Sequence, residues 1–96
     1  MRAILAAVAT VHFTQNLRRH VASESMEVEA GTVAEALATV FARSPALRGY
    51  VVDDQGAVRH HMNIFVDGEM ISDRRRLSDP VREDSEIYVM QALSGG

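Results

Sequence analysis

Apolar and polar residues alternate with two different periods along this chain, and each period predicts a different kind of element. Residues 4–13 are apolar on both alternating faces, as in a central β-strand covered on both sides, or by a helix on one side and a partner on the other. Further on, Met26, Val28 and Ala30 alternate with glutamates, so they should face the core from a second strand. The polar segment from Thr14 to Ser25 is expected to connect the two strands as a loop.

The next segment has the period of a helix. Thr32 and Glu35 form a capping box, in which the Thr hydroxyl accepts from the amide of residue 35 and the Glu side chain reaches back. Apolar residues then recur on one stripe: Val33, Ala36, Leu37, Val40 and Phe41. Arg43 suits the negative end of the helix dipole, and Ser44-Pro45 should end the helix because the residue before proline avoids the α region. The pattern predicts a helix over residues 33–43.

Short apolar runs separated by turn residues follow the helix. Residues 47–52 fit either a short strand or an irregular packed segment, and residues 53–56 form a turn. The Asp67-Gly68 dipeptide lies between the apolar runs 62–66 and 69–71. Asp-Gly flanked by apolar runs is the strongest short signal for a β-hairpin.

The last third of the chain ends in another apolar strand. A charged loop over residues 72–76 precedes Leu77, which should pack against the core. Asp79-Pro80 predicts a single helical turn, with Asp as its N-cap and Pro at the first helical position. Residues 86–93 are then expected to form the final strand.

This order of elements predicts an α+β fold. A lone helix must cover one face of the sheet, and the most apolar strands, the first and the last, belong side by side and parallel at its centre. The predicted fold is therefore a β-grasp, or ubiquitin-like, domain, with a mixed sheet of four to five strands and one main helix packed on one face. With 96 residues, we expect one domain over 1–96, in which 93–96 form a flexible functional tail.

Composition excludes several classes of function. The chain has no cysteine, so it can form no disulfide, Cys-based zinc site or catalytic thiolate. A net charge of −3 gives no basic face for nucleic acid. The apolar stretch near residue 4 is too short for a secretory signal or a membrane span. We expect a cytoplasmic protein that contacts neither nucleic acid nor membrane.

The side chains present few candidate sites. His60 and His61 are adjacent, and adjacent residues on a strand point to opposite faces, so no metal site is expected there. The run Arg74-Arg75-Arg76 is either solvated or directed at an acidic partner, and its role stays open. No catalytic nucleophile motif or phosphate-binding glycine loop is present, so an independent enzyme is not expected.

The most unusual chemistry lies at the end of the chain. After the final apolar strand the side chains shrink to Leu93, Ser94, Gly95 and Gly96. The only distinctive group of this tail is the α-carboxylate of Gly96, and we interpret the folded part as a compact handle for it. Four extended residues reach at most ~14 Å, and glycine lets a backbone approach other groups closely.

Taken together, these features resemble the MoaD/ThiS family of ubiquitin-like sulfur carriers. The resemblance covers nearly the whole chain. The residues that carry it are Phe13, Gly31 to Leu37, Asn63 to Glu69, Leu77 to Val81, Ser85 to Ile87, and Leu93 to Gly96.

The resemblance implies a role as a co-substrate or small subunit rather than as an enzyme, with no cofactor bound by the chain. A partner of the ubiquitin-activating type would use ATP to adenylate Gly96, and sulfur would displace AMP to leave a thiocarboxylate. Leu93, Ser94 and Gly95 would lie in the partner's channel. The sulfur would pass to an acceptor enzyme of the cysteine synthase, molybdopterin synthase large subunit or thiazole synthase type.

Departures from the family pattern bear on the pathway. Molybdopterin-type carriers often have prolines where this chain has Gln91-Ala92, and thiamin-type carriers lack a counterpart of residues 47–61. The family's glycine before the last strand is replaced by Asp84-Ser85, and Asp tolerates the left-handed conformation. The expected pathway is of the cysteine or molybdopterin type. Residues 63–66 are more similar to carriers that serve cysteine biosynthesis, which slightly favours the cysteine pathway.

Two alternatives to the sulfur carrier stay open. A ubiquitin-like modifier would be conjugated to proteins through the same Gly95-Gly96, whereas a plain β-grasp interaction module would not use its tail. All ten basic residues besides histidine are arginines. An activated Gly96 therefore finds no lysine on a sister copy of this chain.

Overall fold

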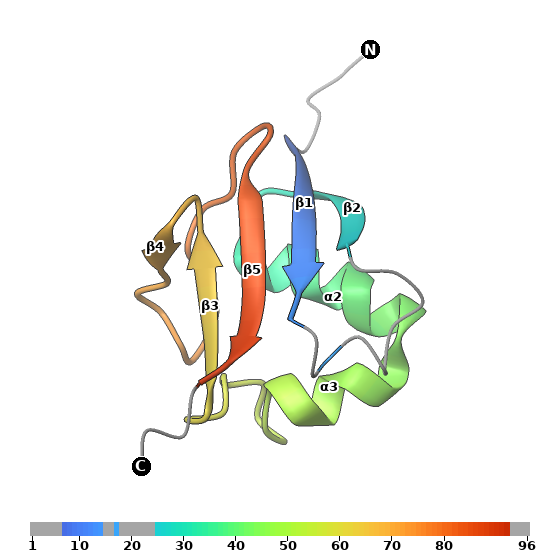
Figure 1. The fold of residues 1–96 in the computed structure, drawn as a ribbon, viewed down its shortest axis with the longest axis vertical. Helices are drawn as coiled ribbons and strands as arrows, with labels where there is room; N and C mark the ends of the chain where they lie inside the picture. Colours follow the sequence, from blue (N-terminus) through green and yellow to red (C-terminus); the bar gives the residue numbers. More distant parts are fainter. Residues whose placement is uncertain (1–6, 15–16, 18–24, 93–96) are drawn as a thin grey trace.

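The computed structural model describes residues 7–14, 17 and 25–92, and these contain one five-stranded mixed sheet. Its strand order is β2-β1-β5-β3-β4 (Figure 1). The strands are β1 (Ala7–Phe13), β2 (Ser25–Ala30), β3 (Met62–Val66), β4 (Glu69–Met70) and β5 (Glu86–Gln91). The central pair β1 and β5 is parallel and the other pairs are antiparallel. The predicted α+β, β-grasp arrangement is confirmed.

The predicted strands are present, with small differences at their boundaries. The first strand is confirmed from Ala7 onward, and residues 4–6 lie outside the described residues. The last strand is confirmed from Glu86 to Gln91; Ala92 is no longer part of it, and Leu93 lies outside the described residues. Of the predicted connecting loop the structure describes Thr14, Leu17, which is buried, and Ser25, which already belongs to β2.

Helix α2 (Val33–Arg43) begins and ends where the sequence predicts. The Thr32 Oγ1 accepts a hydrogen bond from the Glu35 amide at 3.2 Å. The Glu35 carboxylate accepts from the Gly31 amide at 2.7 Å, one residue before the cap, so the box closes slightly wider than expected. The predicted stripe faces the sheet, with Val33, Ala36, Leu37 and Val40 buried and Phe41 packed beside them.

A second helix, α3 (Pro45–Val51), corrects the prediction for residues 47–52: residues 47–51 are helical, and Val52 lies in an isolated β-bridge with Val58. Pro45 occupies the first turn of α3, where its missing N–H costs nothing. Leu47 and Val51 are four residues apart and fully buried, so they form the inner face of this short helix. Pro45 thus lies one residue beyond the C-cap position that follows α2, because Ser44 is the cap, and it begins the next helix.

Asp79-Pro80 does not begin a helical turn, and that prediction was wrong. The Asp79 carboxylate accepts hydrogen bonds from the amides of Ser72 at 2.9 Å and Asp73 at 2.8 Å. It therefore closes the loop that precedes it instead of capping a helix that follows. Pro80 lies in a β-bridge with Thr32 at the start of α2.

The core lies between one face of the sheet and the helices. Val11 of β1, Ile87 and Val89 of β5 and Ile64 of β3 are fully buried, as is Val40 of α2. Figure 1 shows α2 behind the sheet and α3 at the end toward which β1 and β5 point. No helix within the described ranges is long and apolar enough to cross a membrane.

Candidate functional site

The four predicted site residues, Leu93, Ser94, Gly95 and Gly96, lie outside the described residues. The structure does describe the strand that leads to them, as far as Ala92. The geometry of β5 and its neighbours therefore defines the point at which the predicted tail begins.

The end of β5 is paired on both sides. Gln91 pairs with Met62 of β3, and the Ala92 amide donates to the His61 carbonyl at 2.7 Å. This bond extends the β3–β5 pairing one residue beyond the strands. On the other side the Thr14 amide donates to the Val89 carbonyl at 3.3 Å. Ala92 is thus held by a backbone hydrogen bond immediately before the predicted tail.

Hydrogen bonds from Arg74, whose role could not be decided from the sequence, stabilise the turn before β3. The Arg74 guanidinium donates to the carbonyls of Arg59 and Met62, both at 2.7 Å, and to the Asn63 side chain at 3.3 Å. Arg74 is half-buried and bonded within the chain. It is therefore neither simply solvated nor directed at an acidic partner, which were the two interpretations of this run. Arg75 and Arg76 are exposed, so the question of an acidic partner remains for those two.

His60 and His61 lie in this same turn and not on a strand, so the strand argument used for them was wrong. Their rings meet edge to face with centroids 5.7 Å apart, and both residues are exposed. Within the described ranges no group of three His, Cys, Asp or Glu side chains is placed to hold a metal ion. The contribution of this pair to the end of β5 is the His61 carbonyl, which accepts the hydrogen bond from the Ala92 amide.

The sheet face opposite α2 carries an apolar surface. The register places Phe65 beside Met70 of β4 and Tyr88 of β5. Asn63 pairs with Met90, one row nearer to the tail. We call Phe65, Met70, Tyr88 and Met90 the outer-face patch; Met70 is 50% and Tyr88 43% exposed. Large apolar side chains exposed in this way are typical of contact sites.

The outer-face patch was missed because β5 looks like a fully buried strand in the sequence. Only Ile87 and Val89 point into the core, whereas Tyr88 points outward. The His12 ring of β1 stacks on Tyr88 with ring centroids 4.5 Å apart, and its Nε2 pairs with the Glu86 carboxylate. The available signal was the strict alternation of Glu86, Tyr88 and Met90, which share one face.

The start of β5 is fixed by a carboxylate. Asp67 and Gly68 both have positive φ, 52° and 89°, as a tight hairpin turn requires. The Asp67 carboxylate accepts from the Glu86 amide and the Ser85 hydroxyl, each at 2.9 Å, and these bonds lower its pKa. Asp84 has φ 66°, so aspartate does adopt the left-handed conformation at the position where the family has glycine.

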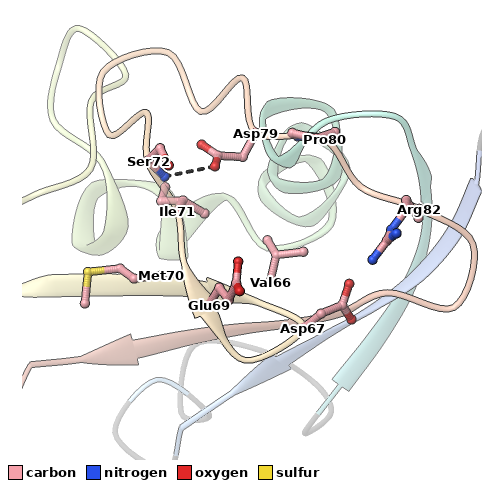
Figure 2. A pocket seen from close by; sticks show the side chains of 9 residues that line it. All are labelled: Val66, Asp67, Glu69, Met70, Ile71, Ser72, Asp79, Pro80 and Arg82. Carbon is pink, nitrogen blue, oxygen red and sulfur yellow. Dashed lines mark hydrogen bonds between the residues drawn. The ribbon is translucent and has the colours of Figure 1, made fainter.

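A hollow of about 410 Å³ lies beside the β3–β4 hairpin. Figure 2 shows Asp67, Glu69 and Asp79 around it, with Arg82 on the side of Asp67. The Asp67 and Asp79 carboxylates each already accept two hydrogen bonds from the chain. The carboxylates of Asp67 and Asp79 therefore stabilise the hairpin and the loop.

Solved structures with this fold include several small ubiquitin-like proteins. SAMP1 from Haloferax volcanii has a TM-score of 0.80 at 24% identity, covering 94% of this chain and 100% of that one. A chain of the Amycolatopsis orientalis BexX/CysO complex has the same TM-score at 24% identity, over 92% and 99% of the two chains. CysO from Mycobacterium tuberculosis, described as an antigen, has a TM-score of 0.78 at 18% identity, over 88% and 99%. At such identities these likenesses establish the fold.

The family is established by the sequence itself. The model of the ThiS family matches residues 11–96, which include the last three residues of β1, the other four strands and the predicted tail. A search of curated proteins gives no match. Small carriers of this kind are generally not catalysts themselves. This chain belongs to the ThiS family, within the MoaD/ThiS group of ubiquitin-like proteins.

Proposed function

We propose that this protein is a sulfur carrier that works through the carboxylate of Gly96 as its terminal residue. A carboxylate oxygen attacks the α-phosphorus of ATP on a ubiquitin-activating-type enzyme, and pyrophosphate leaves. A sulfide nucleophile then attacks the acyl carbon, AMP leaves, and a thiocarboxylate remains. The chain itself binds no cofactor in this scheme, because the partner binds the ATP.

The observation that carries this proposal is the ThiS family match, which runs through the tail to Gly96. The held position of Ala92 supports it, because a donor carbon can be delivered reproducibly only from a defined starting point. From Ala92 the tail Leu93–Gly96 reaches at most ~14 Å. The activating site must therefore come close to the end of the sheet where β5 ends.

The outer-face patch supports a contact between proteins at that end. Tyr88 and Met90 lie on β5 itself, four and two residues before Ala92 respectively. A partner that takes up the tail within such a short reach comes close to this face. Phe65 and Met70 widen the apolar surface, and apolar and aromatic side chains are the usual centre of protein interfaces. We assign this patch to the activating enzyme.

The sulfur acceptor is proposed more coarsely, as a biosynthetic enzyme, and the sequence favours the cysteine or molybdopterin pathway. Its candidates are a cysteine synthase, a molybdopterin synthase large subunit or a thiazole synthase type enzyme. The genes beside the one for this chain distinguish these pathways, because a carrier and its acceptor are commonly encoded together.

A second candidate function is conjugation to other proteins. The observation that favours it is the similarity in fold to SAMP1, a small archaeal modifier protein. Both functions begin with the same acyl-adenylate on Gly96, and they differ in whether sulfide or an amine attacks it. A plain interaction module, the third reading, requires no chemistry at Gly96.

The test changes the length of the tail by one residue, by deleting Gly96 or by adding a residue after it. Either change moves the reacting carbon by up to ~3.6 Å, and a misplacement of about 1 Å costs ~100-fold in rate at a tuned site. We expect ATP–pyrophosphate exchange by the activating enzyme to collapse, with an unchanged thermal melt. Gly96→Ala should be milder, since only a methyl group enters the channel. Normal exchange by the lengthened chain would contradict both the carrier and the modifier functions.

A further inference from the structure

The last backbone bond before the tail depends on a turn that is polar and exposed. Ala92 donates to the His61 carbonyl, and His61 sits in the turn from Arg59 to Met62. Met62 is buried in the core, but His60 and His61 are both exposed, so burial does not hold the middle of the turn. Any movement of this turn moves the carbonyl to which Ala92 is bonded.

Two arginines hold the turn from opposite sides. Arg59 donates its Nε to the Gly49 carbonyl at 2.7 Å and its amide to the Val51 carbonyl at 2.9 Å. Both acceptors lie in the last turn of α3, where carbonyls lack partners within the helix. From the other side, Arg74 donates to the carbonyls at the two ends of the turn, Arg59 and Met62.

The contacts of Arg74 use the shape of its side chain. One terminal nitrogen bridges the carbonyls of Arg59 and Met62, and the other donates to the Asn63 side chain. A planar guanidinium presents these donors in a fixed fork, whereas a lysine ammonium is a compact charge on a flexible stem. The Arg74 carbonyl also accepts from the Val58 amide at 2.8 Å, which holds the two segments together. Arg74 therefore determines the positions of the carbonyls at the two ends of the turn relative to each other.

We propose that Arg74 is a positioning residue for the tail. Through the turn Arg59–Met62 and the His61 carbonyl, it sets the place and direction in which Leu93–Gly96 leave the fold. The expected effect of Arg74 on adenylation rests on the proposed function of Gly96. Because His60 and His61 are exposed while Met62 stays anchored in the core, loosening of the two histidine positions should cost little stability but should shift the His61 carbonyl from which the tail starts.

The first test measures the bond itself, by hydrogen exchange of the Ala92 amide in the full chain by NMR. In Arg74→Gln the amide should exchange at least about tenfold faster than in the wild type, in line with local opening of a less constrained segment. The amides of Val11 and Ile87 in the central strands serve as internal references and should keep their protection. Wild-type protection of Ala92 in Arg74→Gln would overturn the proposal.

The second test separates docking from delivery, with the ubiquitin-activating-type enzyme of the source organism and ATP–pyrophosphate exchange as the readout. The KM for the carrier reports docking through the outer-face patch, whereas kcat reports delivery of the Gly96 carboxylate. We expect Arg74→Gln to lower kcat by roughly 10- to 100-fold while KM stays near the wild-type value. A wild-type kcat, or an effect on KM alone, would contradict a positioning role.

Arg75→Gln is the matched control, because it removes the same charge from the neighbouring, exposed position. It should leave both kcat and Ala92 exchange unchanged. Arg74→Lys keeps the charge and part of the stem, and should fall between Arg74→Gln and the wild type in both readouts. If Arg74→Gln does not fold, Arg74→Lys against Arg75→Lys decides the question with the same expected signs. Failure of wild-type adenylation would refute the proposed function, whereas Ala92 exchange still decides whether Arg74 holds the tail.

Discussion

The two ends of β5 are held in different ways. At its start, the Asp67 carboxylate receives both the Glu86 amide and the Ser85 hydroxyl, and Ser85 is only 2% exposed. At its end, Ala92 is held by one backbone bond to the exposed His61. The start is therefore fixed by side-chain bonds around a buried residue, whereas the end is held through the backbone pairing of Gln91 with Met62 and of Ala92 with His61.

This difference suits a strand that must stay in the core and also present its last residues to another protein. Several bonds at the start keep the register of β5 against β1 and β3, and with it the outer-face patch. An end held through backbone pairing gives the tail a defined starting point outside the sheet. The two kinds of attachment should therefore respond differently to mutation.

The largest expected effect comes from a change that weakens both ends equally. Leu37→Ala empties a fully packed site on α2 and should lower the free energy of unfolding by ~2–5 kcal/mol. Because the loss is global, exchange of amides that open only on global unfolding, such as those of Val11 and Ile87 in the central strands, should rise. A denaturant melt checks this, and a change near zero would show that the stripe on α2 is not the core.

A smaller effect should be confined to the start of the strand. Asp67→Ala removes the acceptor for Glu86 and Ser85 and puts Ala at a positive φ, so it should cost about 1–3 kcal/mol. Below its melting temperature, adenylation should keep the wild-type kcat because the end of β5 is untouched. Asp54→Ala in an exposed turn is the control and should stay within about 0.5 kcal/mol. A large fall in kcat for Asp67→Ala alone would remove the distinction between the two ends.

The smallest effect is a dependence of stability on acid. Hydrogen bonds from the Glu86 amide, then the Ser85 hydroxyl, lower the pKa of Asp67, and the Ser78 hydroxyl, then the Arg76 amide, lower the pKa of Asp73 to about 2. A lowered pKa in the folded state favours the ionised form, so this stability is present above about pH 4 and is lost as the pH falls toward 2.

Denaturant melts between pH 5 and pH 2 measure this dependence. Asp73→Asn should flatten part of it, since the titrating carboxyl at that position is gone. The bonds at the end of β5 use a carbonyl and a guanidinium, which do not titrate in this range. Stability that stays constant down to pH 2 in the wild type would contradict the assignment of these carboxylates.

Much of this fold could be predicted from local patterns, because the relevant partners are close in sequence. The capping box at Thr32 and Glu35 and the Asp67-Gly68 hairpin each determine their own element. The α3 helix was missed because Pro45 was read only as a stop, although it is also favourable in a first helical turn. The partners of Asp79 lie upstream, at Ser72 and Asp73, and no local rule points to them.

The candidate site was only partly predictable for a similar reason. The tail could be singled out from the sequence, because a run of small residues follows an apolar strand. The exposure of Tyr88 depends on which face α2 covers, and an apolar run does not show that. The role of Arg74 depends on carbonyls 15 and 12 residues away, brought together by the fold. Such tertiary bonds are not visible in the spacing of residues.

The most direct test of the central claim is the intact mass of the protein purified from its own cells. The account predicts a species heavier than the unmodified chain by the exchange of one oxygen for sulfur, and its loss when Gly96 is deleted. A ladder of conjugates on other proteins, without the sulfur-bearing species, would instead identify a modifier. If only the unmodified mass is found while the activating enzyme and sulfur source are present, the claim that Gly96 carries sulfur is contradicted.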